Sequence, residues 1–71
     1  MLAKVTRIVG DDLIYLQSEM GCMVMTPDKI DSYRGERLKD IGIGVGTLFR
    51  VNLDARNLIL NATCCPHSST R

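Results

Sequence analysis

The residues best suited to chemistry lie near the carboxyl end of the chain, where Cys64, Cys65 and His67 flank a proline. Thiolates and imidazoles are ligands that zinc prefers, and a cysteine paired with a histidine can act as a nucleophile. Zinc sites, however, use cysteines about two to four residues apart, whereas these two are adjacent. A nucleophilic thiolate also needs a base on a rigid element, and this stretch has no periodic pattern. The sequence therefore predicts no metal site and no catalytic residue.

Two other stretches have residue types that occur in ligand sites. The glycines Gly42, Gly44 and Gly46 lack the Gly-x-Gly-x-x-Gly spacing of a dinucleotide-binding loop, and no helix is expected to begin after them. The acidic pair Asp11 and Asp12 follows a glycine and is interpreted as part of a turn. No cofactor is expected from either stretch.

Basic side chains and a tyrosine on the expected strands indicate recognition of nucleic acid, because cations bind phosphates and flat rings stack on bases. Nine Lys and Arg against eight Asp and Glu give a net charge of only +1, so such a site would need its basic side chains on one face. The residues expected to form it are Lys4, Arg7, Tyr15, Arg50 and Arg56. The alternative interpretation is an ordinary solvated surface, since alternate residues of a half-exposed strand are polar.

A group of methionines and a charged segment indicate a different function, the binding of a protein partner. The side chains expected at that interface are Leu13, Met20, Met23, Arg34 and Arg37. The methionines could instead fill gaps in the core, and the charges of residues 29–40 could form a solvated surface. Exposure of Leu13, Met20 and Met23 together would favour the interface.

Five strand-like segments would position these residues: 2–9, 13–18, 22–25, 48–53 and 58–61. Alternation predicts that Ala3, Val5, Ile14 and Leu16 face the core from the first two strands, with a twist or bulge before Ile8 and Val9. The opposite assignment of the second strand, with Leu13, Tyr15 and Gln17 inward, is the alternative, because a slip of one residue exchanges the two faces. The core-facing side chains predicted in the last two strands, on either side of a turn at 54–57, are Phe49, Val51, Leu53, Leu58 and Leu60.

Between the third and fourth strands, Thr26, Pro27 and Asp28 have the composition of a helix start. Apolar residues then recur at helical intervals but are interrupted by Gly35, which predicts one short helix or two helical turns on either side of that glycine. Residues 63–71 are polar and aperiodic and are expected to form a flexible tail after a β-barrel domain of residues 1–62.

This order of elements is the order of an OB fold. The stretch Val45-Gly46-Thr47-Leu48-Phe49-Arg50-Val51 resembles the entry to the fourth strand in RNA-binding barrels of the ribosomal S-one type, a family that also includes bacterial translation initiation factor one. Residues 53–61 are similar to the family's ending of Asp, a short turn, Arg and alternating hydrophobic residues. The resemblance implies an OB-type barrel that binds RNA. Leu13 and Met23 stand where the family displays aromatic residues, which lowers the expected affinity.

The composition limits the possibilities further. Seventy-one residues, 45% of them hydrophobic, form a single domain. Three cysteines cannot all pair, no secretory leader or membrane span is expected, and a cytoplasmic location follows. The sequence thus predicts an all-β, five-stranded OB-like barrel that is not an enzyme and binds single-stranded RNA weakly. A small protein–protein adaptor or inhibitor, such as one encoded by a phage or another mobile element, is the alternative function, and an SH3-like barrel the alternative fold.

Overall fold

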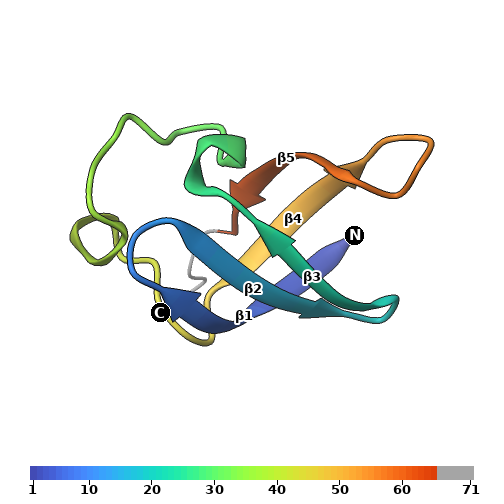
Figure 1. The fold of residues 1–71 in the computed structure, drawn as a ribbon, viewed down its shortest axis with the longest axis horizontal. Coiled ribbons are helices and arrows are strands. Elements are labelled where there is room, and N and C mark those ends of the chain that lie inside the picture. Colours follow the sequence, from blue (N-terminus) through green and yellow to red (C-terminus); the bar gives the residue numbers. More distant parts are fainter. Residues whose placement is uncertain (66–71) are drawn as a thin grey trace.

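Alternating apolar and polar residues build one antiparallel sheet that curls into a half-barrel (Figure 1). The computed structural model describes residues 1–65. Its strands are β1 (Leu2–Val9), β2 (Leu13–Ser18), β3 (Gly21–Met25), β4 (Leu48–Leu53) and β5 (Ile59–Cys64), in the sheet order β3-β2-β1-β4-β5. The predicted all-β class and the five-stranded OB-like barrel are confirmed.

The core lies on the concave face of the curled sheet. Its buried side chains are Ala3, Val5, Ile14, Leu16, Met25, Ile30, Leu38, Ile43, Phe49, Val51 and Ala62. The inward positions predicted for β1 and β2 are therefore confirmed. Fully burying one of the large aliphatic or aromatic side chains stabilises the fold by roughly 1.5–3 kcal/mol.

A bulge in β1 changes which side chains face outward. The pairing of β1 with β2 shifts between Val5 and Arg7, so Thr6 is an extra residue on β1. As a result Thr6 and Arg7 are both exposed, while Ile8 turns toward the core and is half-buried. The predicted irregularity is confirmed, and its consequence is an outward-facing Arg7.

The prediction that Leu58 and Leu60 face the core is wrong, because they are 57% and 56% exposed. Asp54 donates its backbone N–H to the carbonyl of Leu58 at 2.9 Å, and Asn57 has a φ of 64°, so Leu58 closes the turn and β5 begins at Ile59. A slip of one residue exchanges the two faces of a strand. Ile59 is consequently half-buried. The pairing of β4 with β5 shifts between Asn52 and Leu53, and beyond this irregularity the small Ala62 is the fully buried residue of β5.

The connection from β3 to β4 contains two short 3-10 turns, η1 (Pro27–Lys29) and η2 (Leu38–Ile41), and no α-helix within the described residues. The predicted single short helix is therefore wrong, whereas the alternative of helical turns on either side of Gly35 agrees with the structure. The helix start does not propagate because Ile30 forms a parallel bridge with Ala62 of β5. Asp31 donates its N–H to the carbonyl of Ala62 at 2.9 Å, which holds the chain extended after η1.

The end of β5 extends beyond the predicted domain boundary at residue 62. Thr63 pairs with Arg50 and Cys64 with Phe49, so both residues belong to the sheet. Cys65 donates its backbone N–H to the carbonyl of Leu48 at 3.0 Å. The remaining residues of the predicted tail, 66–71, lie outside the described residues.

Acidification is expected to destabilise the connection between the two turns. Hydrogen bonds from the backbone N–H groups of Glu36 and Arg34, the latter at 2.7 Å, hold the pKa of the Glu36 carboxyl below its ordinary value of 4.5. A carboxyl whose pKa is lowered by folding stabilises the protein fully above its ordinary pKa and loses that contribution as the pH falls through the lowered value. Urea unfolding at pH 6 and pH 3 should therefore show a smaller loss of stability for Glu36→Gln than for the unmodified chain. Equal losses in the two proteins would contradict this contribution.

Candidate nucleic-acid interface

The strand residues of the outer, convex face carry positive charge and no negative charge. Within residues 1–65, the one carboxylate bonded to a strand side chain of this face is that of Asp31, from the β3–β4 connection, which accepts the Thr63 hydroxyl at 2.6 Å. Lys4 and Arg7 of β1 and Arg50 of β4 are exposed. None of the strands β1–β5 contains Asp or Glu, because the acidic residues lie in turns and in the β3–β4 connection. The near-neutral chain therefore has a local positive surface, which is the distribution that nucleic-acid binding requires.

The strand register brings Lys4, Arg7 and Tyr15 together. Arg7 lies directly opposite Tyr15, and Lys4 lies opposite Gln17, two residues along β2. Directly opposite residues have Cβ atoms about 4.5–5.5 Å apart, and diagonal neighbours are about 7–8 Å apart. Tyr15 is 37% exposed, so its ring lies on the surface between the two cations.

Arg50 extends this group across β4. Lys4 lies opposite Leu48, and Leu2 lies opposite Arg50, so Lys4 and Arg50 are diagonal neighbours about 7–8 Å apart. Arg50 also lies opposite Thr63 of β5. Four of the five predicted nucleic-acid residues thus form one continuous group, which we call the cationic face: Lys4, Arg7, Tyr15 and Arg50.

Arg56 does not join the cationic face. It lies at the tip of the β4–β5 hairpin, where its backbone N–H donates to the Asp54 carboxylate at 2.8 Å. Because β4 runs antiparallel to β1, this hairpin extends past the amino end of β1 (Figure 1). Arg50 pairs with Leu2, and Arg7 lies five residues farther along β1, roughly 17 Å away at about 3.3 Å per residue. Arg56 lies beyond Arg50 in the other direction and is therefore still farther from Arg7.

The residues predicted for a protein interface are dispersed. Leu13 and Met20 lie at opposite ends of the β2–β3 hairpin, because Ile14 pairs with Met25 and Ser18 with Gly21. Met20 is exposed, but Met23 packs against the core and Leu13 is half-buried. Arg34 and Arg37 are exposed in the β3–β4 connection. The joint exposure of Leu13, Met20 and Met23 that would favour this interface is not observed.

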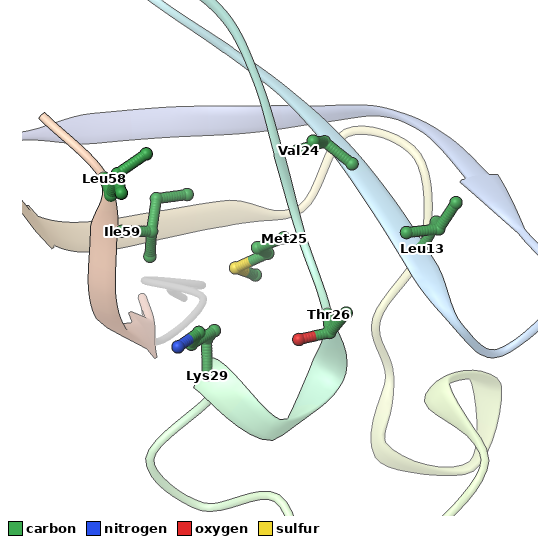
Figure 2. A pocket seen from close by; sticks show the side chains of 7 residues that line it. All are labelled: Leu13, Val24, Met25, Thr26, Lys29, Leu58 and Ile59. Atoms are coloured by element: carbon green, nitrogen blue, oxygen red, sulfur yellow. The ribbon is translucent and has the colours of Figure 1, made fainter.

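A groove that the sequence did not predict lies at the open seam between β3 and β5. It has a volume of about 300 Å³ and is lined by Leu13, Val24, Met25, Thr26, Lys29, Leu58 and Ile59 (Figure 2). Among residues 1–65, Lys29 is the only charged residue that lines it. A signal for the groove was present in the turn chemistry: Asp54 and Asn57 favour a turn that includes Leu58, which leaves Leu58 outside the core.

The cysteines are poorly placed for nucleophilic or metal chemistry. Cys64 is half-buried, and burial, with a smaller effect of Cys65, raises the pKa of its thiol, which disfavours the reactive thiolate. Cys22 is exposed on β3. Within residues 1–65, no three His, Cys, Asp or Glu side chains come together as ligands for a metal ion. His67 lies outside the described residues.

The helical segments of the described chain are all too short and too polar to cross a membrane. Comparisons of the chain with protein-family models, with curated proteins and with solved structures found no match.

Proposed function

We propose that this chain binds single-stranded RNA through the cationic face and does so without enzymatic activity. The observation that carries the proposal is the continuous group of Lys4, Arg7, Arg50 and Tyr15 on strands that contain no acidic residue. Lys and Arg would bind successive phosphates, and Tyr15 would stack on a base. The motif-level resemblance to S-one-type barrels supports this choice of ligand. The free cysteines fit a cytoplasmic location.

The affinity is expected to be modest and sensitive to salt. A single exposed aromatic ring contributes about 1–3 kcal/mol through stacking on one base. Each neutralised phosphate of a single strand contributes about −0.7 to the slope of log K against log salt, so three cations give a slope of about −2. Sequence-independent binding of this kind has a Kd of roughly 1–100 µM.

Fluorescence anisotropy with a labelled oligouridylate at low salt tests the proposal. The double variant Lys4→Gln/Arg7→Gln is expected to bind about tenfold more weakly and to lower the magnitude of the salt slope by about 1.4. Arg56→Gln is the matched control, because it removes one charge at the distant hairpin tip and should change Kd less than about twofold. Tyr15→Leu should weaken binding while leaving the salt slope unchanged, because stacking releases no counterions.

Two results would contradict the proposal. One is equal weakening by Arg56→Gln and by a single cationic-face variant such as Lys4→Gln, which would mean that only net charge matters. The other is an NMR titration with the same oligonucleotide in which the amides around Tyr15 do not move at low salt.

A further inference from the structure

The edge of β3 is free, and the hydrogen-bond pattern of β1 shows which of its residues are unpaired. Val5 donates its N–H to the carbonyl of Thr47 at 2.9 Å, and its carbonyl accepts from Gly46 at 2.8 Å. The backbone N–H and C=O groups of Val5 therefore form their hydrogen bonds on the side of β1 that faces β4. In an antiparallel ladder successive residues bond to opposite sides, so Lys4 bonds to its partner Gln17 on β2.

The same alternation continues through β2 to β3. Because Gln17 bonds to β1, its neighbour Leu16 bonds to its partner Met23 on β3. Cys22 and Val24, on either side of Met23, then direct their N–H and C=O groups away from β2. Within residues 1–65 no backbone group of another segment bonds to either of them. An exposed strand edge of this kind is a template for pairing with another chain.

Two further features mark this edge as a binding site. Strand β3 carries no charged side chain, and Val24 is 51% exposed, so the edge lacks the charges that usually block pairing. The groove beside it is lined by Met25 from β3 and by Leu58 and Ile59 from the opposite side of the seam (Figure 2). Free backbone groups and an apolar groove thus lie next to each other.

The seam is closed at only one end. Ile30 bridges Ala62 in parallel, and the Thr63 hydroxyl donates to the Asp31 carboxylate at 2.6 Å. Strands β3 and β5 point in the same direction on the two sides of the seam (Figure 1). A segment that runs antiparallel to β3 would therefore run antiparallel to β5 as well.

We propose that this seam binds an extended segment of another protein, which adds a strand to β3 and places an acidic residue at Lys29. Strand addition obtains affinity from backbone hydrogen bonds and specificity from pockets for alternate side chains. The groove would take apolar side chains, and the ammonium of Lys29, the only charged lining residue among residues 1–65, would attract a negative charge at its end of the segment. Since Lys29 follows β3, an antiparallel segment meets it with its amino-terminal residue.

A single strand fits the seam better than a second copy of this chain does. A second copy that paired through its own β3 would bring its β2 with it, because the two strands are joined over five register positions. The β4–β5 turn and the start of β5 stand on the other side of the seam, where Leu58 and Ile59 line the groove. One additional backbone requires much less room there than a two-stranded hairpin.

The test uses a peptide of defined chemistry, an N-acetylated and C-amidated heptapeptide of aspartate followed by three threonine–valine repeats, which places the aspartate and the valines on one face of the strand. NMR hydrogen exchange on the full chain should show the amides of Cys22 and Val24 slowed about tenfold or more at saturating peptide, since both acquire backbone acceptors. The resonances of Leu58 and Ile59 should shift with the same saturation curve. A peptide with proline in place of the central valine lacks one N–H and should not bind.

Charge reversal provides the matched control. A peptide with lysine in place of aspartate should bind about threefold or more weakly at low salt, and Lys29→Glu should reverse this preference. Unchanged exchange at Cys22 and Val24 in millimolar peptide would overturn the proposal, as would a preference that Lys29→Glu leaves intact. Slowing of these amides with protein concentration alone would assign the seam to a second copy, and slowing by oligouridylate would assign it to nucleic acid. Either result would also overturn the proposal.

Discussion

A Phe49→Ala variant is expected to be largely unfolded at 25 °C. Phe49 is fully buried near the start of β4, where it pairs with Ala3 of β1 and Cys64 of β5. Replacing a buried phenylalanine by alanine costs about 3–5 kcal/mol, through lost transfer free energy and the cavity that remains. The core of a 70-residue domain rarely supplies more than about 3–5 kcal/mol in total. Circular dichroism should therefore show loss of the sheet signal, and urea titration should show no cooperative transition.

Two neighbouring substitutions control for this effect. Phe49→Leu keeps an apolar side chain in the same space and should retain a cooperative transition with a lower midpoint. Leu48→Ala changes the adjacent, exposed residue of the same strand and should alter the free energy of unfolding by less than about 1 kcal/mol. A cooperative Phe49→Ala transition close to that of the unmodified chain would contradict the central role of this ring.

The sheet could be predicted from sequence where side chains alternate without interruption. In β1 and β2 the inward residues Ala3, Val5, Ile14 and Leu16 follow the period of a strand, and they are buried as expected. Such alternation gives the period of each strand but leaves the two faces of β2 interchangeable, and the pairing of Leu16 with the buried Val5 of β1 decides which face is inward. In β4 the alternating Phe49 and Val51 are likewise buried as expected.

The connection could not be predicted in the same way, because a distant contact determines it. Thr26, Pro27 and Asp28 have the composition of a helix start, yet the Thr26 hydroxyl bonds to the Asp28 carboxylate and caps no backbone N–H. The parallel pairing of Ile30 with Ala62 then stops the helical turn. That pairing joins residues far apart in the chain, and no local sequence pattern near Ile30 predicts it.

The candidate sites show the same division between local and long-range information. Exposure of Lys4, Tyr15 and Arg50 follows from their places in each strand, whereas that of Arg7 depends on the bulge at Thr6. Their proximity depends on the sheet order, which places β1 between β2 and β4 and makes Lys4 a neighbour of Arg50. Arg56 is separated from them by the direction of the β4–β5 hairpin. The groove was not predicted at all, because it requires both the exposed face of Leu58 and the approach of Ile30 to β5.

An Asp54→Ala variant is expected to lose about 1.5–3 kcal/mol of unfolding free energy. One carboxylate oxygen of Asp54 accepts the backbone N–H groups of Arg56 at 2.8 Å and Leu58 at 3.0 Å. Asp54 is half-buried, so alanine leaves these donors without their charged acceptor and removes the side chain that shapes the turn. Urea unfolding measures the loss. Nuclear Overhauser contacts between Leu53 and Ile59 report whether the observed strand pairing survives.

The register between β4 and β5 is weakly specified by hydrophobicity, because apolar residues occupy both faces at the start of β5. A slip of one residue confined to the start of β5, before the register shift opposite Asn52 and Leu53, would bury Leu58 and Leu60 and expose Ile59 while Ala62 stayed in place. The turn centred on Asp54 is therefore what selects the observed register. Asp54→Asn keeps a side-chain acceptor and should lose less than half as much stability, while Arg56→Gln keeps both backbone donors and should behave as the unmodified chain. If Asp54→Ala retained full stability and the Leu53–Ile59 contacts, packing of Ala62 and Ile30 would have to set the register instead.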